Sequence, residues 1–255
     1  MKLSWARFLL VALLPWSAGA QPLPPQPPVP PKPAGVTALP PEGRAYTPGA
    51  FDSIEISGAA TVRLAQGAAD QVFIEGDDEV QRSVSMEVRD GLLVVRPAGN
   101  WKFWNTRRVA LSITARDIKR VVISGAADLI AAEPMQLGRL AVSISGAGLA
   151  RFDQLKAEQL SFHVSGAGDG QVAGVVNELL VIVAGRSEFR GENLMCQQAT
   201  VKISGIADVK VWVTQELGIA VSGVGTVDYW GSPQVRRRTT GIANINERGP
   251  RHAVP

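Results

Sequence analysis

The sequence predicts an all-β protein, a single-stranded β-helix or solenoid with a less regular N-terminal strand region. Three observations lead to this prediction: a recurring Ser-Gly step, rows of apolar residues in phase with that step, and the many β-branched side chains in those rows. We expect the coils of the solenoid to be right-handed.

The Ser-Gly step recurs about every twenty residues. Successive copies start 18 to 21 residues apart, as expected when each repeat is one coil that buries its apolar side only by stacking on its neighbours. An earlier copy, Ser57-Gly58, stands 67 residues upstream of the regular array. We expect each step to be a tight corner at which Gly adopts a positive φ. The regular steps begin at Ser124, Ser145, Ser165, Ala184, Ser204, Ser222 and Thr240.

The residues before each step alternate between apolar and variable positions, as in a half-buried strand. A helical period of about 3.6 residues does not keep these apolar positions aligned with the step, so the pattern predicts strands. The variable, outward row includes His163 and Lys202. The inward row three residues before the step contains Ile54, Val121, Val142, Phe162, Val181, Val201 and Ile219.

Residues 1–20 have the pattern of a secretory signal peptide. Lys2 and Arg7 precede an apolar run from Phe8 to Leu14, and small residues at Ala18 and Ala20 predict cleavage after Ala20. The run is too short to span a bilayer, and no later run of eighteen apolar residues follows. We therefore expect an exported protein without a transmembrane segment, either periplasmic or extracellular at the cell surface.

The rest of the chain divides into a proline-rich linker, residues 21–48, a solenoid domain, residues 49–250, and a tail, residues 251–255. Loss of the signal peptide lowers the formal charge from +3 to +1, which gives no argument for nucleic-acid binding. The one cysteine, Cys196, cannot form an internal disulfide, and we expect it to be a buried apolar residue.

The N-terminal part of the domain is predicted to contain a hairpin and a further strand. Residues 84–88 and 92–96 flank Asp90-Gly91, a strong hairpin signal, and residues 109–113 alternate as another strand. Between these strands lies a segment rich in aromatic and basic residues. Two interpretations remain open: the rings cover the end of the solenoid, or they bind a partner. The candidate partner-binding residues are Trp101, Lys102, Phe103, Trp104, Arg107 and Arg108.

Four residues after the start of most steps lies a carboxylate, while Leu149, Thr226 and Asn244 hold this position in the other coils. In consecutive coils these carboxylates would lie about 5 Å apart and repel unless they are neutralised. Arg190 and Lys210 face the same side, which favours a solvated, ion-paired face over a groove for a divalent cation or a glycan. The candidate acidic face consists of Asp128, Asp169, Glu188 and Asp208.

No catalytic arrangement is evident. His163 lies in the outward row and His252 in the tail, and spacing ties neither to a nucleophile or a carboxylate. We predict no catalytic residue, no cofactor and no metal site. The enzyme alternative is a carbohydrate-active β-helix that uses the acidic face.

Several motifs together resemble the bacterial family called putative auto-transporter adhesin, head GIN domain. They are the opening Phe51-Asp52-Ser53-Ile54-Glu55-Ile56-Ser57-Gly58, the repeated Ser-Gly-Ala-Gly, Val227-Asp228-Tyr229-Trp230-Gly231-Ser232-Pro233 and Thr240-Gly241-Ile242-Ala243-Asn244-Ile245. The resemblance covers roughly residues 50–247. It departs at Arg186 and Ser187, which replace small apolar residues, and at Thr240, which starts the last step.

The resemblance implies a secreted or cell-envelope β-helix without established catalysis. Together with the residues it favours an exported, non-enzymatic binding or structural module, adhesin-like, whose partner is an envelope protein or a glycan. A periplasmic protein that binds a partner in envelope signalling is a further alternative.

Overall fold

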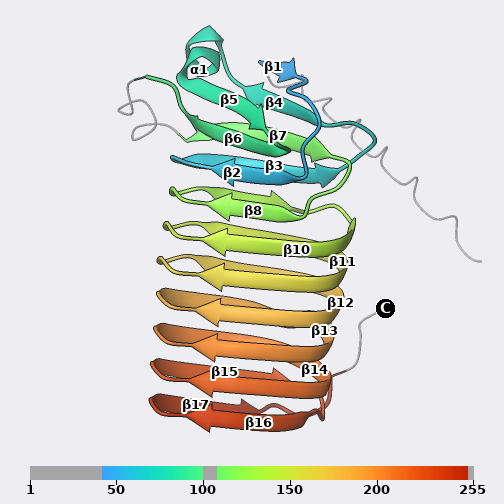
Figure 1. The fold of residues 1–255 in the computed structure, drawn as a ribbon, viewed down its shortest axis with the longest axis vertical. Coiled ribbons are helices and arrows are strands. Elements are labelled where there is room, and N and C mark those ends of the chain that lie inside the picture. The colour runs from blue at the N-terminus through green and yellow to red at the C-terminus, as the bar shows by residue number, and fades with distance from the viewer. Residues whose placement is uncertain (1–41, 100–107, 252–255) are drawn as a thin grey trace, which may run out of the picture. The chain divides into compact units, whose positions relative to one another are not determined.

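The computed structural model describes residues 42–99 and 108–251. These residues form an all-β solenoid of about six turns, as the sequence predicts. In Figure 1 the front strands, such as β8, β10 and β16, run to the left and the strands behind them run to the right while the chain descends, so the coils are right-handed.

The regular array contains long strands that pair in parallel with the same strand positions of the next coil. This register is what the in-phase apolar rows require, because each row must stay at one depth from coil to coil. The strands are β8 (Arg120–Ile123), β9 (Asp128–Ala131), β10 (Met135–Ile144), β11 (Leu149–Val164), β12 (Asp169–Val183), β13 (Arg186–Ile203), β14 (Ile206–Val221), β15 (Val224–Trp230), β16 (Gln234–Thr239) and β17 (Ile242–Glu247).

Each coil has three sides, which we number by their order around the Ser-Gly corner. Face 1 is built by the residues before the corner, from β8 and the ends of β10 to β14 through β16. Face 2 is built by the residues after it, from β9 and the starts of β11 to β14 through β15 and β17. Face 3 lies between them in the middle of the long strands, where register shifts at Phe152/Leu155 and at Gln171/Ala173 bend the chain.

The order of the coils along the stack differs from their order in the sequence. Strands β2 (Ser53–Ile56) and β3 (Ala60–Gln66) pair with β8 and β9, which follow much later in the chain. Strands β6 (Leu92–Pro97) and β7 (Val109–Ala115) pair with the other edge of β2 and β3. The coil of β6 and β7 is therefore the outermost one, and the upstream Ser57-Gly58 step belongs to the regular stack.

Antiparallel strands cover this end of the solenoid. Strand β4 (Gln71–Glu75) pairs with the edge of β7, and β5 (Val84–Arg89) pairs with the edge of β6. The predicted hairpin is confirmed between β5 and β6, with φ of 50° at Asp90 and 77° at Gly91. Because both edges of the outermost coil are paired, neither is left open to other strands.

Two elements of this end were not expected from the sequence. Strand β1 (Gly43–Tyr46), from the end of the proline-rich segment, pairs with β4. The short helix α1 (Asp78–Ser83) connects β4 and β5. Its N-cap is Asp77, whose carboxylate accepts hydrogen bonds from the backbone N–H groups of Glu79 and Val80.

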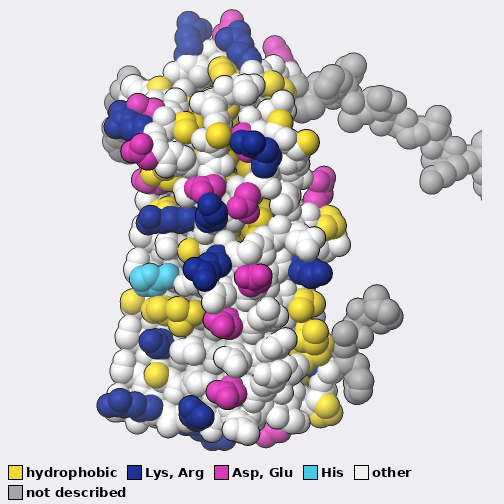
Figure 2. Space-filling view, turned by 45° about the vertical axis from the view of Figure 1, so that its right-hand side comes forward, with side chains coloured by type: hydrophobic (Ala, Val, Ile, Leu, Met, Phe, Trp, Pro, Cys, Tyr) yellow, Lys and Arg dark blue, Asp and Glu magenta, His cyan; other side chains and the backbone are white. Residues whose placement is uncertain are grey.

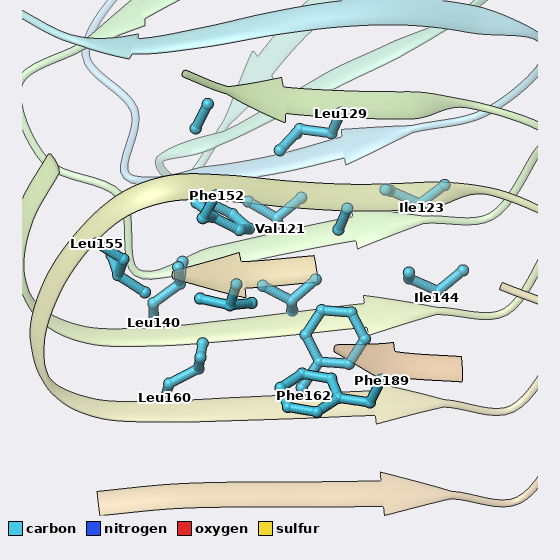
Figure 3. Packing of buried hydrophobic residues seen from close by; sticks show 14 of the residues in the cluster. Val121, Ile123, Leu129, Leu140, Ile144, Phe152, Leu155, Leu160, Phe162 and Phe189 are labelled. Atoms are coloured by element: carbon cyan, nitrogen blue, oxygen red, sulfur yellow. The ribbon is translucent and has the colours of Figure 1, made fainter. Parts of the chain in front are cut away.

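The inward rows form one continuous core. Val121, Val142, Phe162, Val181 and Val201 are at most 1% exposed. Figure 3 shows Phe162 from face 1 beside Phe189 from face 2, with ring centroids 5.1 Å apart and planes tilted by 58°. A Cβ on Gly170 would lie 2.5 Å from the Phe162 ring, so this glycine makes room for the aromatic pair.

The corner glycines are required for a different reason from the one we predicted. Only Gly58 among the step glycines has a positive φ, 95°. At Gly125 an added Cβ would lie 2.1 Å from the carbonyl oxygen of Gly58, and at Gly146 it would lie 1.9 Å from that of Gly125. The prediction of positive φ was therefore wrong: glycine recurs because the corners of successive coils stack backbone on backbone.

The last coil departs from the apolar pattern. Arg237 pairs in register with Ile219 and so occupies the position that buried apolar residues fill in earlier coils. Arg237 is exposed, and the neighbouring Arg236 and Arg238 are exposed as well. A charge at an inward position discourages further strand pairing at an edge.

Candidate functional site

The acidic residues occupy face 2, and three of them stack. Glu188 pairs in register with Asp208, and the carboxylate of Asp169 accepts a hydrogen bond of 2.8 Å from the backbone N–H of Glu188. Asp128 is separated from Asp169 by Leu149, which pairs with both. The row is therefore continuous only from Asp169 to Asp208.

Cations neutralise the centre of this row. Arg190 Nη2 and Lys210 Nζ lie 2.5 and 3.0 Å from the two carboxylate oxygens of Glu188. The hydrogen bond from Arg190, opposed by partial burial and reinforced by Lys210, lowers the pKa of Glu188 from 4.5 to about 2. Asp128 pairs with Arg108. Within the described residues, no group of three or more Asp, Glu, His or Cys side chains is placed to hold a metal ion.

Most of the aromatic and basic segment lies outside the described residues. This applies to Trp101, Lys102, Phe103, Trp104 and Arg107, so their candidate role stays a prediction. Arg108 is described, and its partner is Asp128 of the acidic face. The strands that pair with the edges of the outermost coil are β4 and β5.

Face 1 contains a groove that we had not expected from the sequence. It has a volume of about 580 Å³ and crosses four coils, at Ala141, Ser161, Leu180 and Thr200. These four residues pair in register through β10 to β13 and point outward from the core. Because the groove runs from coil to coil, it extends along the axis of the solenoid. Figure 2 shows part of face 1.

Longer polar side chains border the groove on the side of face 3. Gln159 donates a hydrogen bond of 2.9 Å from Nε2 to Oε2 of Glu178. Arg139, Gln198 and Lys119 complete this border. The sequence contains a signal for this shape: small or neutral residues recur in one outward row, next to a row of long polar residues. The depth of the groove also depends on the bend between faces 1 and 3, which the rows alone do not reveal.

Among the described residues, the Cys196 thiol is buried and the His163 imidazole is exposed. Cys196 is buried at 1% exposure, as predicted, and its Sγ lies 3.1 Å from the carbonyl oxygen of Trp212. Burial raises the pKa of the Cys196 thiol to about 12. His163 is exposed on face 1, in register between Ser143 and Ile182.

Solved structures from other bacteria share this fold. A putative adhesin from Bacteroides fragilis NCTC 9343 superposes with a TM-score of 0.74 at 20% identity, covering 80% of this chain and 95% of the adhesin. A putative lipid binding protein from Parabacteroides distasonis ATCC 8503 has a TM-score of 0.63 at 19% identity, with 81% and 96% covered. A putative adhesin from Parabacteroides merdae ATCC 43184 has a TM-score of 0.59 at 18% identity, with 81% and 95% covered.

At these identities the superpositions establish the fold. No curated protein matches the chain. No helix within residues 42–99 and 108–251 has the length and the apolar character needed to cross a membrane. The family described as putative auto-transporter adhesin, head GIN domain, matches residues 50–233, which is most of the solenoid. The chain therefore belongs to this family.

Proposed function

We propose that this protein is an exported, non-enzymatic binding module of the cell envelope or the extracellular surface, and that it holds an extended partner along face 1. The groove of about 580 Å³ is the observation that carries the proposal. It is open and long, and its border offers amide and carboxylate groups that can form hydrogen bonds with a polar chain.

The family supports the same coarse function. Its description and those of the Bacteroides fragilis and Parabacteroides merdae structures refer to adhesins, and the Parabacteroides distasonis structure is described as a lipid binding protein. The signal-peptide pattern of residues 1–20 supports export, and the proline-rich segment that follows supports a tether between the cell and the solenoid.

Face 2 gives less support for a binding or catalytic groove. The carboxylate of Glu188 is already paired with two cations, which is the arrangement of a solvated, ion-paired face. Most glycoside hydrolases use a pair of carboxylates that exchange protons with the sugar or attack it, and a carboxylate held by two cations is a poor candidate for that role. We therefore place the partner on face 1.

A bulky substitution in the groove tests the proposal. Ser161→Trp fills the middle of the groove from an outward position, so it should reduce retention of the mature protein on isolated cell-envelope fragments and leave the melting temperature nearly unchanged. Gln171→Trp is the matched control, because Gln171 is an outward residue of face 2. Equal retention of both variants and the parent would contradict a role for the groove. N-terminal sequencing of the exported protein should begin at Gln21.

A further inference from the structure

Basic side chains without partners gather where face 1 reaches the last coils. Lys202, Arg236 and Arg238 are exposed, and within the described residues none of them forms an ion pair. On face 2, in contrast, Arg190 and Lys210 both pair with Glu188 of the same face. Figure 2 shows Lys and Arg side chains near this end of the solenoid. Unpaired positive charge concentrated on one surface attracts anions.

Two of these cations flank a small side chain. Ala220 pairs in register with Lys202 on one side and with Arg238 on the other. The backbones of the two basic residues are therefore two coil steps apart, about 10 Å, with only a methyl group between them. A hollow of about 390 Å³ lies here and is lined by Lys202, Ala220 and Arg238. Both side chains are long and flexible enough to reach over Ala220 toward one ligand.

The corner hydroxyls line the same hollow. Ser204, Ser222 and Thr240 begin three successive steps and belong to its lining. The hydroxyls of Ser204 and Ser222 each lie 3.4 Å from a backbone carbonyl oxygen of the preceding coil, which is at the long limit of a hydrogen bond. Each hydroxyl can rotate to donate its proton to a ligand instead. Two cations and three hydroxyl-bearing residues thus line one hollow, and together they favour an oxyanion.

We propose that Lys202, Arg238, Ser204, Ser222 and Thr240 form a site for the carboxylate of an acidic glycan. This rests on the proposed function, because the glycan would continue from the site along the groove of face 1. The Gln159 and Gln198 amides at the groove border both donate and accept hydrogen bonds, which matches sugar hydroxyl groups.

Aliphatic residues such as Leu180 line part of the groove, but its open shape and its polar border of Gln159, Glu178 and Gln198 favour a glycan over a lipid. An acyl chain in an open groove would keep much of its apolar surface in contact with water, whereas a hydrated polysaccharide chain does not depend on being enclosed. A peptide is also less favoured, because the backbone groups of face 1 already pair between coils and offer no free strand edge along the groove.

The test measures binding of the mature protein to polygalacturonate and to alginate by isothermal titration, with neutral dextran as the uncharged probe. Lys202→Gln combined with Arg238→Gln should weaken binding to the acidic glycans about tenfold or more, because charge-assisted hydrogen bonds are lost. The salt dependence of binding should also decrease. Lys156→Gln combined with Arg186→Gln is the matched control, since it removes one exposed Lys and one exposed Arg from other faces and should leave binding unchanged.

The outcomes separate this inference from the proposed function. If the parent binds neither acidic glycan, binds dextran equally well, or is unaffected by Lys202→Gln with Arg238→Gln, the anion site is refuted. The proposed function still stands if Ser161→Trp reduces retention on envelope fragments. Binding to phosphatidylglycerol vesicles but not to the acidic glycans would identify a lipid headgroup as the source of the anion and would overturn the glycan assignment.

Discussion

The hydroxyl oxygens of Ser57 and Ser124 lie 2.9 Å apart, although 67 residues separate them in the sequence. This contact places the upstream Ser-Gly step directly on the first step of the regular array. The intervening chain forms β4, α1 and β5, which cover the end, and β6 and β7, which form the outermost coil. The N-terminal region is thus part of the stack as well as its cover.

Because the corners stack backbone on backbone, a side chain at any step glycine should destabilise the folded protein. Gly125→Ala should lower the free energy of unfolding by about 1–3 kcal/mol, because its Cβ would lie 2.1 Å from the backbone of Gly58. Gly138→Ala is the control, since an added Cβ there meets no atom within 4 Å. Urea unfolding of both variants measures the difference. Equal stability of the two would show that the corners have room for a side chain.

The inward row predicts that substitutions at two neighbouring residues differ strongly in their effect on stability. Val201 is fully buried, so Val201→Asp should destabilise the protein by about 3–5 kcal/mol or prevent folding, because the charge has no partner in the core. The adjacent Lys202 is exposed, and Lys202→Gln should change stability by less than about 0.5 kcal/mol. Thermal unfolding followed by circular dichroism distinguishes the two. An unchanged melting temperature for Val201→Asp would contradict the inward assignment.

We expect that replacing Ser187 by alanine stabilises the protein. The Ser187 side chain is buried, and its hydroxyl has no hydrogen-bond partner among residues 42–99 and 108–251. The residue paired with it in the next coil is Ala207. Ser187→Ala should therefore raise the free energy of unfolding by about 1 kcal/mol, because it removes a buried unsatisfied polar group. Chemical denaturation at neutral pH is the measurement. A loss of stability would mean that the hydroxyl has a favourable interaction in the folded protein.

The ion pairs of Glu188 predict a defined pH dependence. The folded protein holds the pKa of this carboxyl at about 2, below its ordinary value of 4.5. The stabilisation is fully present above pH 4.5 and is lost as the pH falls from about 4.5 to about 2, since the unfolded state takes up the proton first.

Glu188→Gln should therefore cost about 1 kcal/mol or less at pH 7. It should also reduce the decline in stability between pH 4.5 and 2, and melting temperatures across this range provide the comparison. A decline as steep in Glu188→Gln as in the parent would assign the acid sensitivity to other carboxylates.

The sequence alone determined the coil and its inward surfaces. Side chains alternate across a strand with a period of two, and the corners recur every 18 to 21 residues, so the buried rows and the all-β fold are local patterns that a reader of the sequence can follow. The acidic row of face 2 and its pairing with Arg190 and Lys210 were predictable for the same reason, because these residues recur at the same place in successive coils.

Only the tertiary structure decided what depends on contacts between distant residues. The true reason for the corner glycines is the approach of one coil to the next, as between Gly125 and Gly58, and no local backbone rule reveals it. The same holds for the coil order at the N-terminal end. The groove depends on the bend between faces 1 and 3, and the hollow beside Ala220 depends on three coils placing Lys202 and Arg238 on either side of one methyl group.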